Sequence, residues 1–252
     1  MTVTFLAHSG FLVEWDAFYT LFDFWHGELP ELNKNKPLLV FASHSHEDHF
    51  DKRIFTLPAL YPDTRFFLSH DISVATRRWA RMGLNAEIAA RITRLRADEL
   101  HTLTVAGEPL SIRTVHSTDT GAAFLLTAEG RMVYHAGDNN WWHWEEEGKA
   151  YCANMAAGYR RSIAALAAAV RDEAYDLHLE PELAAAMVPM DPRLEEHFGL
   201  GAEYLMKQIP VKKLFPMHLW DKFEWIDRFR AEHPNLADAV VPIRRDGESF
   251  VI

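Results

Sequence analysis

Four potential metal ligands lie within six consecutive positions of this sequence, in residues 44–49, which read His-Ser-His-Glu-Asp-His. Packing alone does not explain such a density of imidazoles and carboxylates. The stretch follows an apolar run of strand length at 37–43 and precedes residues 50–55, which could open a helix. It therefore predicts a loop between a strand and a helix, where functional side chains commonly lie.

The side chains of this loop can converge on one small volume. If the backbone stays extended through Ser45, His44 and His46 project to the same side. The turn into the helix then brings Asp48 and His49 toward them. Imidazole nitrogens and carboxylate oxygens are ligands of first-row transition metals, and a metal ion removes the desolvation cost of burying such groups unpaired. The alternative is a polar helix start whose histidines are solvated.

The motif is similar to the signature of the metallo-beta-lactamase superfamily, His-x-His-x-Asp-His followed by a lone His, a Gly-Asp pair and a final His. The later parts match at His116, at Gly137-Asp138 and at His218, each at the end of an apolar strand-like run. The resemblance implies one metal at His44, His46 and His116, a second at Asp48, His49 and His218, and a bridge at Asp138. Asp48 and His218 are also expected to act in catalysis.

Strand and helix patterns follow one another in two strand-rich halves, each followed by helices. Apolar runs and turn signals predict strands at 3–7, 11–15, 18–24, 37–43, 64–69, 103–105, 110–115, 122–127, 132–135, 184–189, 213–218, 240–243 and 249–251. Caps at Asp71, Asn85 and Asp221, together with helical apolar spacing, predict helices at 71–81, 85–95, 152–173, 201–208 and 221–232. The resemblance implies an α/β fold, the four-layer αββα sandwich of the metallo-beta-lactamase type, in a single domain over residues 1–252.

Composition narrows the expected partners. The chain has 252 residues, of which 48% are hydrophobic, so a sizeable core can form. A formal net charge of -10 produces a long-range field that repels phosphate backbones, which counts against a non-specific nucleic-acid binder. We therefore expect a small-molecule substrate, and an oligomer is compatible with the sequence.

Cysteine content and apolar segments bear on the compartment. Cys152 is the single cysteine, so neither an intrachain disulfide nor a thiolate cluster can form. The N-terminus lacks the basic region and long apolar stretch of a signal peptide. The most apolar helical candidate, residues 163–170, is far shorter than the roughly 20 residues that cross a bilayer. We expect a cytoplasmic protein without a membrane partner.

Open coordination positions on such metals indicate catalysis. Three protein ligands leave room for water, and two ions about 3.5 to 4 Å apart can activate a hydroxide and polarise a substrate. The expected function is a metal-dependent hydrolase that uses a metal-bound hydroxide on a small anionic ester, lactone or phosphodiester. Two divalent ions are the expected cofactors, zinc first and manganese or iron as alternatives. Di-iron relatives generally carry a Glu where His46 stands, which favours hydrolysis here.

The first part of the chain is most similar to the superfamily branch that includes the ascorbate-phosphate lactonase. The similarity rests on residues 8–14, His-Ser-Gly-Phe-Leu-Val-Glu, and on residues 21–23, Leu-Phe-Asp. Within them, His8 and Asp23 are candidates to support the metal ligands, against the alternative of turn residues at strand ends. Asn139 departs from the Thr or Ser that many members carry after Gly-Asp. The tryptophans of residues 141–144 either line a substrate pocket or pack to support Asp138.

Two other functions stay open. A metal-dependent nuclease or phosphodiesterase on RNA would use a basic cluster, whose alternative is a solvated helix face, formed by Arg77, Arg78, Arg81, Arg91, Arg94 and Arg96. A non-catalytic metal-binding protein would keep the fold without the activity, but the full set of ligands argues against it. Arg193, Lys222 and Lys52 are candidate anchors for an anionic substrate, against the alternative of ordinary surface residues.

Overall fold

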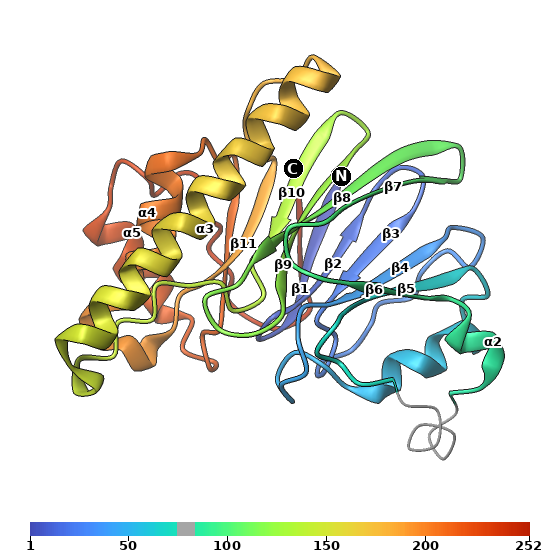
Figure 1. Cartoon of the computed structure of the whole chain (residues 1–252), viewed down its shortest axis with the longest axis horizontal. Helices are drawn as coiled ribbons and strands as arrows, with labels where there is room; N and C mark the ends of the chain where they lie inside the picture. The colour runs from blue at the N-terminus through green and yellow to red at the C-terminus, as the bar shows by residue number, and fades with distance from the viewer. Residues whose placement is uncertain (75–83) are drawn as a thin grey trace.

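Two β-sheets lie face to face with helices on their outer sides in the computed structural model, which describes residues 1–74 and 84–252 (Figure 1). The first sheet has the strand order β13-β1-β2-β3-β4-β5-β6 and the second the order β12-β11-β10-β9-β8-β7. This arrangement confirms the predicted αββα sandwich. No helix within the described residues is both long and apolar enough to cross a membrane.

The first sheet begins as an antiparallel meander and continues as a parallel sheet. Its strands are β1 (Thr2–Ala7), β2 (Gly10–Glu14), β3 (Tyr19–Phe22), β4 (Leu38–Ala42), β5 (Thr64–Ser69), β6 (Ile92–Leu95) and β13 (Glu248–Val251). Pairing is antiparallel from β13 to β3 and parallel from β3 to β6. The predicted strands of this half are confirmed, and β6 is an addition to them.

The second sheet shows the same change of direction. Its strands are β7 (Leu100–Val105), β8 (Glu108–His116), β9 (Ala122–Ala128), β10 (Arg131–His135), β11 (Ala185–Pro189) and β12 (Leu214–Met217). Strands β7 to β10 pair antiparallel, whereas β10, β11 and β12 run parallel. The carboxyl ends of these three parallel strands therefore open at one edge of the sheet, which is where α/β proteins place their sites.

Helices cover the two outer faces unequally. The second sheet is covered by α3 (Gly148–Leu177), α4 (Leu200–Gln208) and α5 (Glu224–Glu232), and the first by the short η1 (Lys52–Ala59) and α2 (Ala86–Ala89) (Figure 1). Strand β4 is consequently buried on both faces. Leu39 and Phe41 point into the core between the sheets, while Leu38 and Val40 point into the smaller core under η1.

Two predicted helices differ from the structure. Residues 50–55 fall in a turn and the 3₁₀-helix η1 rather than in an α-helix. Asn85 does cap a helix, since its side chain accepts from the Ile88 amide, but α2 ends at Ala89 and the run toward Leu95 is strand β6. β-Branched Ile92 and Thr93 suit that strand, and Ile92 pairs with Phe66 of β5.

The caps at Asp71 and Asp221 have different outcomes. The cap of α5 is Phe223, which makes no side-chain cap hydrogen bond, so the prediction that Asp221 caps this helix is wrong. Asp71 instead accepts a hydrogen bond from the Ser45 amide at 2.8 Å, beside the metal-ligand motif. The helix predicted from Asp71 to residue 81, with Arg77, Arg78 and Arg81, lies largely outside the described residues.

Candidate metal centre

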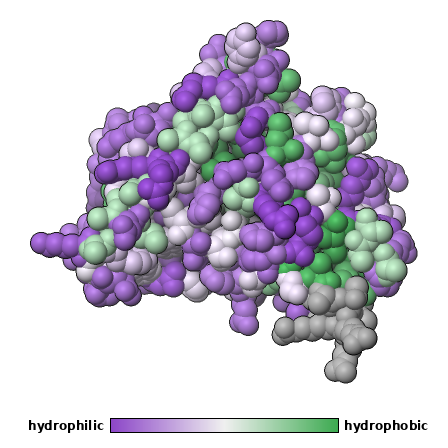
Figure 2. Space-filling view, in the orientation of Figure 1, coloured by the Kyte–Doolittle hydropathy of each residue, from purple (hydrophilic) through white to green (hydrophobic). Residues whose placement is uncertain are grey.

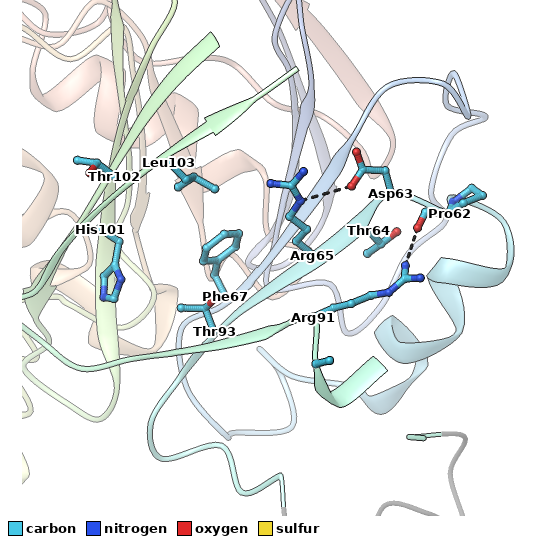
Figure 3. A pocket seen from close by; sticks show the side chains of 11 residues that line it. Pro62, Asp63, Thr64, Arg65, Phe67, Arg91, Thr93, His101, Thr102 and Leu103 are labelled. Carbon is cyan, nitrogen blue, oxygen red and sulfur yellow. Dashed lines mark hydrogen bonds and ion pairs between the residues drawn. The ribbon is translucent and has the colours of Figure 1, made fainter. Parts of the chain in front are cut away.

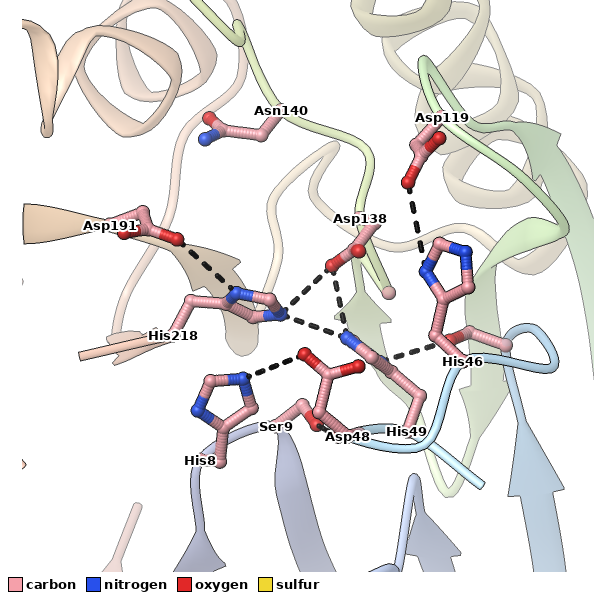
Figure 4. Close-up of polar contacts among 12 residues, drawn as sticks. His8, Ser9, His46, Asp48, His49, Asp119, Asp138, Asn140, Asp191 and His218 are labelled. Atoms are coloured by element: carbon pink, nitrogen blue, oxygen red, sulfur yellow. Dashed lines mark hydrogen bonds and ion pairs between the residues drawn. The ribbon is translucent and has the colours of Figure 1, made fainter. Parts of the chain in front are cut away.

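The candidate ligands lie where strands end, at the edge shared by the two sheets (Figure 4). His44 follows β4, Asp138 follows β10 and His218 follows β12. Parallel pairing aligns the ends of β10, β11 and β12, so Asp138 and His218 come together from positions 80 residues apart along the chain, with Asp191 after β11 beside them. The candidate site therefore combines the 44–49 motif after the first sheet's β4 with side chains that follow parallel strands of the second sheet.

One group of ligand atoms surrounds His49 and His218. Their Nε2 atoms lie 2.8 Å apart, and Asp138 Oδ1 is 3.1 Å from the first and 2.9 Å from the second. His8 and Asp48 join the group, with one atom of each side chain within 4.8 Å of the ligand atoms of His49 and His218. The contact between His8 Nε2 and Asp48 Oδ2 measures 3.4 Å.

A second group lies on the other side of Asp138. His44 Nε2 is 3.0 Å from His46 Nδ1 and 3.4 Å from Asp138 Oδ2. Asp138 therefore directs one carboxylate oxygen toward each group. This is the placement that a bridging ligand between two metal ions requires.

Buried carboxylates fix which nitrogen of each imidazole is free. His49 Nδ1 donates to Asp23 Oδ2 at 2.7 Å, and His218 Nδ1 lies 3.5 Å from Asp191 Oδ2. The Nε2 atoms therefore carry the lone pairs, and these face each other beside an oxygen of Asp138. Two lone pairs and a carboxylate at such distances need a cation between them. The donor set fits a divalent metal ion, because imidazole and carboxylate are its usual ligands.

Asp23 also organises the second group through Ser43. The Ser43 amide and hydroxyl both donate to Asp23 at 2.7 Å, and Ser43 Oγ lies 2.9 Å from His44 Nδ1. With its own proton on Asp23, this oxygen accepts from His44, which leaves His44 Nε2 free to bind a metal. The prediction that Asp23 supports the ligands thus has a geometric basis, since one carboxylate contacts His49 directly and His44 through Ser43.

Two glycines make room for this arrangement. Gly121 (φ 72°) and Gly137 (φ 55°) both pack against Ser43. A Cβ atom would lie 2.0 Å from the Ser43 carbonyl oxygen at Gly121 and 2.6 Å from the Ser43 Cβ at Gly137. Any larger side chain at either position would displace Ser43 and with it the hydrogen bond to His44.

Three non-glycine residues of the site also have a left-handed backbone conformation. His8 (φ 52°), Asp23 (φ 43°) and His218 (φ 62°) adopt a conformation that is uncommon for non-glycine residues. Such conformations persist where surrounding contacts over-determine them, and they cluster at functional sites. Here the His218 amide donates to the His8 carbonyl at 3.3 Å, which ties the β1–β2 turn to the end of β12.

The electrostatics of the centre suit a cation. Burial alone would raise the pKa of the Asp138 carboxyl, but the charges of His49 and His218 hold that pKa well below its usual range. Burial would likewise lower the pKa of His49, yet attraction to Asp138 and Asp23 raises it well above the usual value. The buried carboxylates therefore hold positive charge at this point, as protons when no metal ion is bound.

The structure brings six of the seven expected ligands together and leaves one apart. The six are His44, His46, Asp48, His49, Asp138 and His218. Among the described residues, His116 belongs to no group that could hold a metal, and its exposed side chain lines a different cavity with Asp98 and Arg161. From the same segment, Asp119 Oδ2 lies 3.8 Å from His46 Nδ1.

Two supporting residues were not expected from the sequence. Asp191 is fully buried after β11 and contacts His218, and Asp119 reaches the site from the loop between β8 and β9. Each is an acidic residue just after a strand end, a weak signal that many surface aspartates share. By contrast, His135 takes no ligand position, because its Nε2 bonds to the Ser9 carbonyl at 2.9 Å.

A cavity of about 320 Å³ opens beside both groups of ligands, since His46, Asp48 and His218 line it together with Asp119. Its wall contains aromatic and apolar side chains and one cation, namely Trp142, Trp144, Tyr151, Met155 and Arg193. The tryptophan segment both lines this cavity and contacts the Asp138 backbone. Trp142 and Trp144 stack on each other in the wall, and Trp142 Nε1 donates to the Asp138 carbonyl at 3.0 Å. Trp141 instead packs against Tyr159 and Tyr204.

A larger cavity, of about 800 Å³, lies away from the centre, at the open edge between β5, β6 and β7 (Figure 3). Its cations are already paired, because Arg65 contacts Asp63 at 3.4 Å and Arg91 contacts Glu87 at 2.6 Å. It offers no cluster of metal ligands among the described residues. The face drawn in Figure 2 is mostly hydrophilic, and its strongest hydrophobic areas lie on the right-hand side of the view.

Comparisons with solved structures find the same fold in proteins of low sequence identity. Igni18, a metallo hydrolase from Ignicoccus hospitalis, shares 19% identity over 100% of this chain and 98% of its own, with a TM-score of 0.62. An isothiocyanate hydrolase from Delia radicum gut bacteria shares 13% identity over 100% and 99%, with a TM-score of 0.55. The CmlA beta-hydroxylase E377D mutant shares 9% over 100% and 54%, with a TM-score of 0.59.

Sequence comparisons cover less of the chain than the structural ones, but they identify its family. No curated protein matches the chain. The family model described as the beta-lactamase superfamily domain matches residues 2–150, which include β1 to β10, the His-x-His-x-Asp-His motif and Asp138. That match covers more than half of the chain and includes the ligands of both groups except His218. The chain belongs to the metallo-beta-lactamase superfamily.

Proposed function

We propose that this protein is a metal-dependent hydrolase with two divalent ions, acting on a small anionic ester, lactone or phosphodiester. The observation that carries the proposal is the pair of facing Nε2 atoms of His49 and His218, 2.8 Å apart, beside an oxygen of Asp138. Since Asp23 and Asp191 occupy the Nδ1 sides, these lone pairs are available to a metal. A packing role would not need two imidazoles oriented in this way.

The ligand assignment follows the two groups. One ion would be held by Asp48, His49 and His218, with Asp138 shared, and His8 would orient Asp48. The other would be held by His44, His46 and Asp138, and we infer that Asp119 completes this set in place of His116. Bound there, the ions would activate water and polarise the substrate. Zinc suits these ligands first, with manganese and iron as alternatives.

The chain's own residues then position the substrate. Arg193 lines the cavity beside the ligands, and its guanidinium lies over the ring of Trp220 at 4.6 Å and near that of Trp144 at 5.7 Å. Its Nη2 and Nε bond to buried Asp191, at 2.5 and 2.9 Å, which holds the side chain in place. A guanidinium fixed beside aromatic rings suits a small anionic molecule with an apolar part. The similarity to the lactonase-containing branch keeps a lactone among the candidates.

Two features favour this proposal over oxygen chemistry at a di-iron centre and over RNA cleavage. His46 favours hydrolysis over di-iron oxygen chemistry, for which the resemblance implies a Glu at that position. The RNA-cleaving alternative needs free cations, but among the described arginines of the basic cluster Arg91 pairs with Glu87 and Arg94 donates to the His70 carbonyl. With a net charge of -10, the chain offers little general attraction to phosphate backbones.

Metal analysis and a substrate panel test the proposal together. Purified protein dialysed against zinc or manganese should contain two ions per chain at the centre, and the metal-loaded protein should hydrolyse an ester, a lactone or a phosphodiester. Turnover should change only modestly between low and physiological salt, because few phosphates would be contacted. Strongly salt-dependent RNA binding, or no hydrolysis of any panel member by fully loaded protein, would contradict the proposal.

A further inference from the structure

Three side chains that could bind a metal come together from two separate segments. They line a cavity that shares Trp144 and Arg193 with the cavity beside the metal centre. His143 and Glu145 lie just before α3, and His197 is the last residue of η4 (Pro192–His197). One ligand atom of each lies within 4.8 Å of the other two. His197 Nε2 is 3.0 Å from Glu145 Oε1, and the rings of His143 and His197 are 4.1 Å apart.

This arrangement has the chemistry of a zinc site. Two imidazoles and a carboxylate are a known donor set, with the fourth position left to water. Two imidazoles so close would repel each other if both were protonated, whereas a divalent ion can be shared by both. Both rings are half-buried and Glu145 is exposed, so the ligands are partly ordered and an ion can enter from solvent.

The surroundings strengthen the attraction for a cation. A cavity of about 400 Å³ surrounds the three ligands, and three more carboxylates lie in its wall, those of Glu146, Glu195 and Glu196. Arg193 is the one arginine or lysine in that wall, where four glutamates outnumber it. The local field therefore favours a divalent cation over an anion.

The backbone of η4 is kinked close to His197. Glu195, two residues earlier, has φ 52° and ψ -110°, which interrupts the helix. A non-glycine residue in that region carries strain that persists only where other contacts hold it. The kink lies between Arg193, which faces the substrate cavity, and His197, which faces Glu145.

We propose that His143, Glu145 and His197 bind a third divalent transition-metal ion, with zinc as the best match, separate from the catalytic centre. The ion would link the segment after Asp138 to the segment after β11. Both segments contribute to the substrate cavity, since Trp144 and Arg193 line that cavity as well as this one. Zinc at this site would therefore hold the cavity wall in place and act on substrate binding rather than on the chemical step.

Zinc stoichiometry tests this site without reference to activity. Full-length wild-type protein and the double variant His143→Gln/His197→Gln are dialysed against the same free zinc concentrations, and bound zinc is measured by elemental analysis. The wild type should bind one more zinc per chain than the double variant, whose remaining zinc should equal that of the catalytic centre. Glu145→Gln, which removes only the charge, should weaken binding of the same ion.

His101→Gln is the matched control. His101 Nε2 lies 3.2 Å from Glu99 Oε2, both side chains are 34% exposed, and no third ligand from residues 1–74 or 84–252 joins them. This variant should bind as much zinc as the wild type. Circular dichroism would confirm that each variant is folded. Equal zinc in the double variant and the wild type would overturn the proposal, as would loss of all bound zinc from a folded double variant. A protein that binds the extra zinc but hydrolyses nothing would leave this site intact and contradict only the proposed hydrolase function.

Discussion

The two halves of the metal centre differ in how firmly their ligands are held. On one side, the side chains of His49 and His218 are 0% and 2% exposed, and each contacts a fully buried aspartate. On the other, His44 is 0% exposed, but His46 is 51% exposed, and Asp119, whose Oδ2 lies 3.8 Å from His46 Nδ1, is 47% exposed. Asp138 stands between them with one oxygen toward each half. We refer to these as the buried half and the open half.

The difference in burial indicates that the two halves bind their metal ions with different affinities. In the buried half the ligands are oriented before any ion arrives, because Asp23 and Asp191 fix the imidazoles, so little ordering entropy opposes binding. In the open half His46 and Asp119 must still become ordered, and they line the cavity together with Asp48 and His218 of the buried half. We expect the first ion to bind tightly in the buried half and the second to exchange.

The largest effect should come from removing a ligand of the buried half. His49→Ala leaves Asp23, Asp138 and His218 without their shared partner, so both ions should be lost and hydrolysis should fall to background. His46→Ala should abolish activity but release only the ion of the open half. Elemental analysis of both variants distinguishes these outcomes. The control is His233→Ala, far from the centre and near Glu203, which should change neither quantity. Equal metal loss in the His49 and His46 variants would remove the distinction between the halves.

Asp23→Asn tests the support rather than the ligands. An amide keeps the shape of Asp23, but it can neither accept every hydrogen bond from Ser43 and His49 nor supply a charge. Metal affinity should fall roughly 10- to 100-fold, the usual effect of losing a carboxylate behind a metal-bound histidine. Isothermal titration with zinc measures it, with Asp227→Asn as the control, because Asp227 pairs with Arg244 on the surface. Unchanged affinity would show that the buried half does not depend on this carboxylate.

The pKa of His49 makes metal binding in the buried half depend on pH. Attraction to Asp138 and Asp23 raises the pKa of His49 well above 6.5, so at neutral pH the metal-free protein holds a proton that an ion must displace. Affinity of the buried half should therefore rise with pH from 6.5 until the folded pKa is passed, by up to about tenfold per unit for each proton released. The same raised pKa stabilises the metal-free fold below pH 6.5, and this contribution is lost as pH rises through the folded value.

Titrations in buffers of different ionisation enthalpy count the released protons. We expect at least one proton per ion in the buried half at pH 7. Binding of the first ion without release of a proton would contradict this prediction.

The contrast between the halves also explains what the sequence could predict. The motif of residues 44–49 carried the family resemblance, and that resemblance implied the αββα fold and the later ligands Asp138 and His218. Period-2 alternation predicted the strands and the convergence of His44 and His46, because it places side chains by counting. Positions in irregular backbone could not be counted in this way. His8 and His218 reach the site through left-handed residues, and Asp191 meets His218 only because β11 and β12 pair in parallel.

His116 shows the limit most clearly. It ends β8 opposite Ala122 of β9, and that register leaves its side chain exposed in another cavity. The loop that follows, closed by Gly121 against Ser43, carries Asp119 toward His46 instead. A family pattern specifies residue types and spacing. The position at which a strand ends decides which of the residues near it reaches the metal site.

The smallest expected effect compares these two residues directly. Asp119→Asn removes a carboxylate 3.8 Å from His46 and should weaken the exchangeable ion of the open half on the order of tenfold, about 1.4 kcal/mol, while the ion of the buried half stays bound. His116→Ala should leave both ions in place, because its side chain lies in a separate cavity. Competition titrations with a chromophoric chelator resolve the two affinities. If His116→Ala releases the weaker ion and Asp119→Asn does not, the ligand set implied by the family resemblance is correct and the loop between β8 and β9 must rearrange on metal binding.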